Sequence, residues 1–385
     1  MEASAVTPSV KVNERLLSLD VFRGITIAGM VLVNNPGTWS AIYPPLEHAK
    51  WNGCTPTDVI FPFFLFIVGV AIPFALGKRI ERGDSQKEII LQIIRRSITL
   101  FLLGFFLACF PFGLFGHHFD LSTIRIPGVL QRISVVYLAA ALIFLKTNYK
   151  VQIYIGAAIL IVYCALMTLV PVPGVGYANL EPATNLGAWL DRTLLGNHLW
   201  ASSKVWDPEG ILSTFPAIAT SIMGMITGWW LRSDKDKTTK TVWLFVMGSI
   251  CMTLGYIWDG WFPINKSLWT SSYVLYTGGL ALLFLGFCYW FIDVRKSKWW
   301  IKPFQVYGLN AITVFFLSGL FGRLMYTIKV PYGNEMIGLD AYLFRNLYLP
   351  LASPINASLL WAISYILGML GLMWILYSKK IFLKV

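Results

Sequence analysis

Residues 57–77 read TDVIFPFFLFIVGVAIPFALG, and only Asp58 in this run carries a formal charge. At 1.5 Å per residue, a helix of this length crosses the ~30 Å hydrocarbon core of a bilayer. Apolar and polar residues do not alternate here, as they would in the strands of a membrane barrel. The stretch therefore predicts a transmembrane helix.

The rest of the chain repeats this pattern. Of its 385 residues 56% are apolar and 13% are charged, whereas a soluble domain has about a quarter charged. Ten apolar runs cover 17–35, 57–77, 90–113, 126–145, 151–171, 209–231, 240–259, 268–292, 304–324 and 355–378. We expect an all-α integral membrane protein: one transmembrane domain over 1–385, a polytopic bundle of about ten helices, with 1–16 as a cytoplasmic tail.

The net charge of +12 is unevenly distributed. Nineteen Lys and Arg residues lie in the two chain ends and in alternate connections, seven lie in the other connections, and five lie within the runs. The positive-inside rule then puts both chain ends in the cytoplasm. It also accounts for the charge without a nucleic acid partner, and it puts the segment EHAKWNGCTPTD (47–58) on the outer side.

Polar residues inside the runs are costly, so each is a site hypothesis. In SLDVFRGITIAGMVLVNN (18–35), Asp20 and Arg23 share a helical face; they either anchor the helix at the interface or reach an anionic ligand. Asn34 either ends this helix or donates a hydrogen bond into the bundle. The pair Arg95 and Arg96 is interpreted as a contact with lipid headgroups.

The fourth run opens with RIPGVLQR (125–132). Arg125 would suit the outer interface, whereas Gln131 and Arg132 lie deeper and should face a polar interior. For Arg132 a structural salt bridge and a ligand contact both stay open.

The outer connections are polar next to the helix ends. Carboxylates there would attract an amine, and indole faces with amide groups would suit a sugar, although helix dipoles alone would also favour acids at helix starts. The residues of this predicted vestibule are Trp51, Asn52, Asp58, Asp207, Glu209, Asn265 and Lys266.

His48 is one of four histidines and precedes the turn Trp51-Asn52-Gly53. It is either a loop residue held by that turn or a catalytic group. Because the sequence has no zinc signature, nucleophile elbow or phosphate-binding glycine loop, we expect no metal in its chemistry.

The motifs LVNN, EHAKWNGCTPTD, RIPGVLQR, DPEGIL, INKSLW and KKIFLKV, with SLDVFRG before them, make the chain similar to the heparan-alpha-glucosaminide N-acetyltransferase family over nearly its whole length. The resemblance implies a membrane enzyme, a homodimer, that moves an acetyl group from cytosolic acetyl-CoA to a terminal glucosamine amine on the far side. His48 matches the family's active-site histidine and Asn34 its essential asparagine.

Compared with lysosomal members, the chain lacks an N-terminal luminal segment and first helix, and Asn35-Pro36-Gly37 replaces a Tyr-Gly-rich turn. We therefore expect the shorter, bacterial-type member, in the inner (plasma) membrane with its active site open to the periplasmic side. The acceptor would be glucosamine or a related amino sugar.

In this scheme the phosphates of acetyl-CoA stay at the cytoplasmic mouth while the slender pantetheine arm threads inward. The expected acetyl-CoA contacts are Asp20, Arg23, Arg125, Gln131 and Arg132. His48 would act as a general base or as a nucleophile, and Asn34 would stabilise the oxyanion. The alternative is a transporter of a sugar or small solute that uses the same charges without chemistry.

Overall fold

The computed structural model describes residues 16–114 and 119–382, so residues 1–15 of the predicted tail lie outside the described part. The helices are α1 (Leu17–Asn34), α2 (Ile60–Glu81), α3 (Gln86–Cys109), α4 (Val129–Lys146), α5 (Tyr149–Leu169), α6 (Leu186–Leu195), α7 (Thr214–Arg232), α8 (Lys237–Asp259), α9 (Ser271–Tyr289), α10 (Lys302–Leu309), α11 (Ala311–Thr327), α12 (Leu339–Leu343) and α13 (Pro354–Ser378). Single turns of 3-10 helix occupy Pro44–Leu46 and Pro56–Val59, and π-helical turns occupy Trp290–Val294 and Phe344–Tyr348. One small antiparallel hairpin joins β1 (Lys329–Tyr332) to β2 (Glu335–Gly338). The expected helical membrane bundle is confirmed.

Among the described residues, eight helices are long and apolar enough to cross a membrane, or up to nine if the bent pair α10 and α11 is one span. The predicted run 209–231 forms α7, which is not among them. This helix is buried between other helices, and Thr220 and Ser221 in it are fully buried. Because α7 faces protein rather than lipid, small and polar residues replace the apolar side chains that a lipid-facing helix needs.

The run 304–324 does not form one straight helix. It breaks at Asn310, and α10 and α11 meet at an angle of 82°. Asn310 is buried with φ −123° and ψ 36°, which are not helical angles. Irregular backbone at membrane depth is tolerated where it is covered by protein or lines a polar cavity. This break meets that condition, as the cavities described below show.

Helix α7 packs against α2. The helices approach closely because glycines face each other: a Cβ on Gly69 would lie 2.0 Å from the Ser221 carbonyl oxygen, and one on Gly224 would lie 2.1 Å from that of Phe66. Helices α1 and α10 meet in the same way at Gly24 and Gly308. Small residues at helix contacts are the usual means of close packing in membranes.

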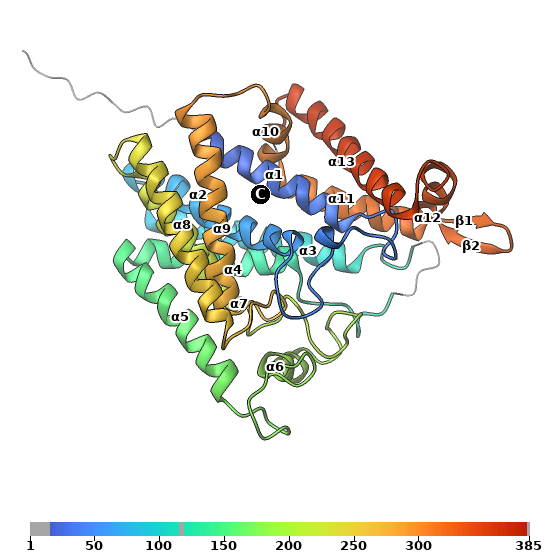
Figure 1. The fold of residues 1–385 in the computed structure, drawn as a ribbon, viewed down its shortest axis with the longest axis horizontal. Coiled ribbons are helices and arrows are strands. Elements are labelled where there is room, and N and C mark those ends of the chain that lie inside the picture. The colour runs from blue at the N-terminus through green and yellow to red at the C-terminus, as the bar shows by residue number, and fades with distance from the viewer. Residues whose placement is uncertain (1–15, 115–118, 383–385) are drawn as a thin grey trace, which may run out of the picture.

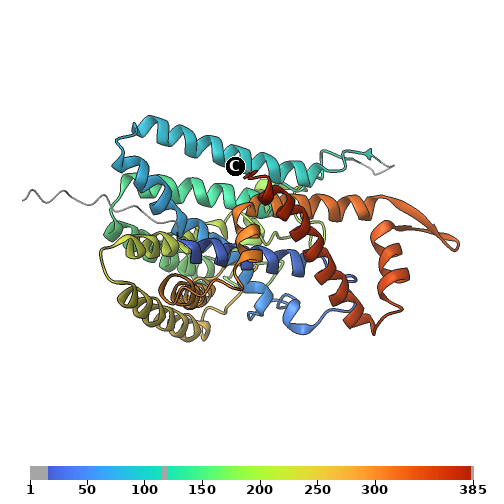
Figure 2. The ribbon, with the colours of Figure 1, turned by 90° about the horizontal axis from the view of Figure 1, so that it is seen from above.

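The two ends of the bundle differ in kind. The α2–α3 and α7–α8 connections lie together at one end, and the β1–β2 hairpin extends from the other (Figures 1 and 2). The connections at the first end are short and rich in Lys and Arg. The long connections at the other end hold α6, the hairpin and the segment 47–58, and they form the candidate site.

The structure changes two predicted helix starts. The run 209–231 becomes helical only at Thr214, so Asp207 and Glu209 lie in the turn before α7 rather than on its first turn. Likewise α9 begins at Ser271, which leaves Asn265 and Lys266 in a loop. These polar residues are therefore held by side-chain contacts and not by helix dipoles.

Candidate active site

The segment 47–58 is fastened to the loop that precedes α9. The Gly53 N–H donates to the Ile264 carbonyl at 2.7 Å, and Gly53 has φ +106°, a conformation that favours glycine. The Asn265 side chain donates to the Asn52 side-chain oxygen at 3.2 Å. Loops from distant parts of the sequence thus form one unit beside His48.

His48, Asp58 and Lys266 form a cluster in this unit. His48 Nδ1 lies 2.7 Å from Asp58 Oδ1. Lys266 Nζ lies 3.0 Å from His48 Nδ1, 3.3 Å from its Nε2 and 3.6 Å from Asp58 Oδ1. The side chain of His48 is 50% exposed and that of Asp58 only 1%. A buried carboxylate behind a half-exposed imidazole can keep the proton on Nδ1 and leave Nε2 to accept one from a ligand.

Asp58 is held rigidly before any ligand binds. Its Oδ2 accepts hydrogen bonds from the Ala49 and Thr55 amides, both at 3.0 Å, and from the Thr55 hydroxyl at 3.1 Å. The Tyr273 hydroxyl also donates to the Asp58 carbonyl at 2.6 Å. Several donors around one carboxylate favour its ionised form. Asp58 is therefore a positioning group for His48.

Lys266 has an environment that weakens its charge. Burial lowers the pKa of its amine below the ordinary value, although the carboxylates of Asp58 and Glu209 act in the opposite direction. An ammonium that loses its proton more readily, within reach of both imidazole nitrogens, can exchange a proton with His48 or with a ligand beside it.

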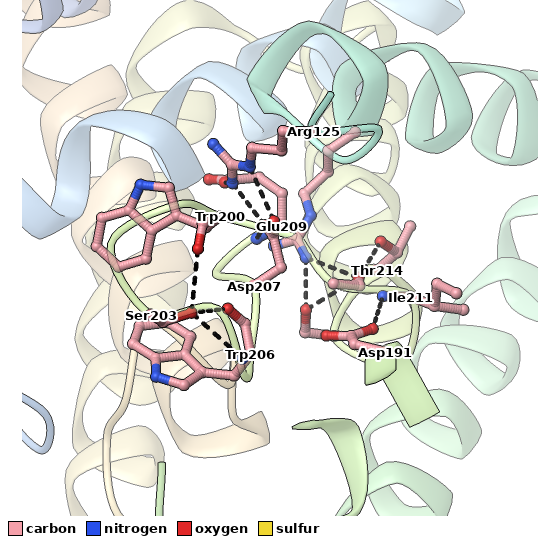
Figure 3. A network of polar contacts seen from close by, with 12 residues as sticks. Arg125, Asp191, Trp200, Ser203, Trp206, Asp207, Glu209, Ile211 and Thr214 are labelled. Carbon is pink, nitrogen blue, oxygen red and sulfur yellow. Dashed lines mark hydrogen bonds and ion pairs between the residues drawn. The ribbon is translucent and has the colours of Figure 1, made fainter. Parts of the chain in front are cut away.

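A second cluster gathers around Arg125, shown in Figure 3. Arg125 Nε donates to Asp207 Oδ2 at 2.8 Å, and its Nη2 pairs with both Asp207 and Glu209. Its charge is thus offset by two carboxylates. All three residues were predicted to bind substrate or cofactor, and the structure brings them together as one ion-pair network.

Arg132 lies in the first turn of α4, next to this network, and is 2% exposed. Its Nη2 donates to the Gly210 carbonyl at 3.0 Å and to the Ser213 hydroxyl, and its guanidinium lies 5.2 Å from the centre of the Trp269 ring. Its Nε and Nη1 have no hydrogen-bond partner among the described residues. The expectation that Arg132 faces a polar interior fits this position.

Three indoles join the two clusters. The Trp51 and Trp206 rings are 5.2 Å apart, and the Trp200 and Trp206 rings are 5.4 Å apart. Trp51 also donates to the Leu180 carbonyl at 3.0 Å. The predicted vestibule is therefore one continuous assembly of outer loops, and its aromatic side chains stabilise it as well as lining it.

An outer cavity of about 740 Å³ opens beside this assembly. Its polar lining includes Asn34, Asn35, Arg125, Gln131 and Arg323. Trp39, which is 70% exposed, and Trp200 add aromatic faces. This volume is typical of sites for small molecules. His48 is not part of the lining of this cavity, so the structure places it on the neighbouring loop rather than against Asn34.

An inner cavity of about 630 Å³ lies toward the Lys- and Arg-rich end. Arg23, Arg95 and Arg96 line it together with Gln92 and Thr99. Arg96 lies 4.7 Å from the centre of the Tyr137 ring, and its buried Nε has no hydrogen-bond partner among the described residues. Arg23 Nη1 lies 3.4 Å from Asp20 Oδ1, as expected from their spacing. Three guanidinium groups around one cavity suit a ligand with several negative charges.

The two cavities share four helices and nearly meet. On α3, Leu100 lines the inner cavity and Gly104 the outer one; on α4 the corresponding residues are Ile133 and Leu130. Such pairs are one helical turn apart, about 5 Å. The break between α10 and α11 lies at the inner cavity, where Gly308, Leu309, Ala311 and Ile312 line it. The residues where the two cavities approach each other, among them Leu100, Leu130 and Ile133, are buried and apolar.

Three further arginines line the cavities, although they were not predicted to do so from the sequence. Arg95 and Arg96 were interpreted as headgroup contacts, yet they line the inner cavity, and Arg323 had been noted only in the charge count. A usable signal existed for the first pair. Gln92, Arg95, Arg96 and Thr99 recur at helical spacing on α3, which marks a polar face in an apolar helix.

Within residues 16–114 and 119–382, no group of three or more His, Cys, Asp or Glu side chains has an arrangement that could hold a metal ion. The candidate site consists of arginines, amides, indoles and the cluster of His48, Asp58 and Lys266.

The fold and its two cavities define a polytopic membrane protein with ligand space at both ends of one bundle. Residues 15–204 match a family model described as a domain of unknown function, DUF5009. The chain is 31% identical to heparan-alpha-glucosaminide N-acetyltransferase of Homo sapiens and 30% identical to that of Mus musculus, over 96% of this chain in each case. It spans 60% of the length of these relatives. The likeness to the heparan-alpha-glucosaminide N-acetyltransferases predicted from the motifs is therefore confirmed, and the chain is a relative of these enzymes.

Proposed function

We propose that this protein transfers an acetyl group from cytosolic acetyl-CoA to the amine of a terminal glucosamine, or of a related amino sugar, on the extracytoplasmic side. The observation that carries the proposal is the pair of cavities on shared helices, cationic at the inner end and lined with amides and indoles at the outer end. The likeness to N-acetyltransferases along 96% of the chain supports the same reaction class.

The inner cavity fits the charged part of acetyl-CoA. Arg23, Arg95 and Arg96 would hold its phosphates, and the unpartnered Nε of Arg96 supplies a buried donor that lacks an acceptor. An arginine inside a membrane is costly unless a counter-charge or water accompanies it. Bound there, acetyl-CoA supplies a thioester whose acetyl group passes to an amine with release of the thiol.

The outer cavity fits an amino sugar. Its amide groups, from Asn34, Asn35 and Gln131, can donate to and accept from hydroxyl groups, and the rings of Trp39 and Trp200 offer flat apolar faces. Asn34 would donate a hydrogen bond to the oxyanion that develops in acyl transfer, in a cavity where such bonds act strongly.

His48 would accept the proton that the acceptor amine loses. Asp58 keeps the imidazole in the tautomer with a proton on Nδ1, so Nε2 is the basic atom, and Lys266 lies near enough to pass the proton on. Because His48 lies on the loop beside the outer cavity, the amine must sit at the cavity mouth for this role.

The proposal includes a location. The positive-inside count supports both chain ends in the cytoplasm and the segment 47–58 outside. On the strength of the resemblance, the membrane would be a bacterial inner membrane, with the outer cavity open to the periplasm. A homodimer is part of the proposal on the strength of the resemblance.

Labelled acetyl-CoA and glucosamine, incubated with detergent-purified protein, test the reaction directly. His48→Asn keeps a donor toward Asp58 but has no basic nitrogen, so the rate should fall by about 100-fold or more. Glu47→Gln, at an exposed neighbour, is the matched control and should keep the wild-type rate. A protein that binds amino sugars but acetylates none across a panel would instead be a transporter.

Impermeant maleimide on intact cells tests the sidedness. Lys50→Cys and Lys298→Cys both introduce an exposed thiol, one in the segment 47–58 and one in the α9–α10 connection. Only Lys50→Cys should be labelled before lysis. Labelling of Lys298→Cys alone would overturn the proposed orientation.

A further inference from the structure

Arg323 on α11 is a cation of the outer cavity that does not belong to the ion-pair network of Arg125. Among the described residues, two arginines and one acidic residue line this cavity: Arg125, Arg323 and Asp340. Arg125 is engaged by Asp207 and Glu209. No ion pair within 4.0 Å joins Arg323 to a described carboxylate, including Asp340, and the hydrogen bond of its Nη1 goes to the Gly319 carbonyl of its own helix at 3.2 Å.

The surroundings of Arg323 increase its need for a counter-charge. Arg125 is near enough to repel it electrostatically. Arg323 also lies within a membrane-length segment, where an unpaired guanidinium is expensive. Its side chain is exposed and lines the cavity. A ligand anion at this position would make charge-assisted hydrogen bonds that no described side chain makes.

We propose that Arg323 binds an anionic substituent of the acceptor, so that the acceptor class is an amino sugar carrying a sulfate, phosphate or carboxylate group. This inference rests on the proposed function, and it makes Arg323 a specificity residue of the outer cavity. Asn34 and Arg323 line the same cavity, so one sugar can present its amine toward the first and its anionic group toward the second.

The test compares kcat/KM for glucosamine and for glucosamine 6-sulfate, with glucosamine 6-phosphate as a second anionic probe. Wild type should prefer each anionic sugar by about 10-fold or more, because a hydrogen bond to a charged group is worth at least that factor. Arg323→Gln should bring the ratio close to one, and Arg323→Lys should retain part of the preference. Arg345→Gln is the control, since Arg345 is an exposed cation over the Tyr332 ring and does not line the cavity.

A wild-type ratio near one, or a preference that survives Arg323→Gln, overturns the inference while acetylation of glucosamine still stands. If neither sugar is acetylated, the proposed function fails first. Titration calorimetry with the two sugars then decides the role of Arg323 on its own. Tighter binding of the sulfated sugar, lost in Arg323→Gln, supports it, and equal binding in wild type refutes it.

Discussion

Asp58→Asn should inactivate His48 without displacing it. Asp58 Oδ2 accepts three hydrogen bonds from Ala49 and Thr55, whereas Oδ1 faces His48 Nδ1 and Lys266 Nζ. The asparagine must therefore place its oxygen toward the three donors and its NH₂ toward the imidazole. His48 then has to accept at Nδ1, which moves its own proton to Nε2. The nitrogen that should accept the substrate proton becomes a donor.

The expected loss of rate in Asp58→Asn can be bounded from this change of tautomer. The equivalent replacement in the serine protease triad lowers kcat about 10⁴-fold. Here Lys266 also contacts both ring nitrogens and offers a second route for the proton, so we expect a loss of roughly 10²- to 10⁴-fold, about 3–5 kcal/mol in the barrier. The three bonds to Ala49 and Thr55 survive, so the thermal unfolding midpoint should change little.

The assay is the steady-state rate of acetyl transfer by purified protein, with Asp259→Asn as the control. Asp259 also fastens this loop assembly, because its Oδ1 accepts from the Ile264 amide at 2.6 Å, but it does not touch His48. Asp58→Asn with kcat within about threefold of wild type would refute the tautomer argument. An equal loss in Asp259→Asn would show that loop geometry, and not the proton on His48, sets the rate.

Three further predictions use other parts of the molecule. Arg96→Gln should raise KM for acetyl-CoA about 10-fold with little change in kcat, because it removes a remote binding contact; Arg82→Gln, an exposed cation of the α2–α3 connection, should not change initial rates. Burial and then the Asp58 charge raise the pKa of the Cys54 thiol to about 12, so at pH 8 its alkylation by iodoacetamide should be roughly a thousand-fold slower than that of the exposed thiol introduced by Lys298→Cys. Burial raises the pKa of Asp191 to about 6; between about pH 4 and pH 6 the folded protein keeps a proton there that the unfolded chain has released, so stability falls as pH rises through this window. Asp191→Asn keeps the acceptor for the Ile211 amide, and its unfolding midpoint should lose that part of the pH dependence; an unchanged dependence would refute the assignment.

The membrane spans were predictable because hydropathy over about 20 residues reports directly on the length of the lipid-facing surface. The break at Asn310 was not, because a single buried asparagine in the run 304–324 leaves the average unchanged. A tertiary contact lies directly before the break: a Cβ on Gly308 would lie 2.0 Å from the carbonyl oxygen of Asp20 on α1. Such contacts between segments far apart in sequence have no local signature.

The candidate site was also predictable only where local sequence was sufficient. His48, Asp58 and Lys266 were each singled out from local polarity, but nothing in the sequence indicates that residues 48 and 266 touch. That contact depends on the pairing of Gly53 with Ile264 and Asn265. The interpretation of Arg95 and Arg96 as headgroup contacts used only their depth along the helix. It left out the direction in which they point around the helix axis. The face of a helix, rather than distance from its end, decides whether an arginine meets lipid headgroups or a cavity.

The five arginines within the predicted runs are divided between the two cavities and their surroundings, as the proposed separation of donor and acceptor requires. Arg23, Arg95 and Arg96 line the inner cavity, Arg323 lines the outer one, and Arg132 is buried beside the outer network. Along α1, Arg23 and Asn34 mark the two cavities and are 11 residues apart, about 16 Å of helix. This is roughly half the ~30 Å hydrocarbon thickness. In the proposed reaction, a nucleotide held by the inner arginines would leave about 16 Å for the uncharged arm to span in bringing an acetyl group to Asn34.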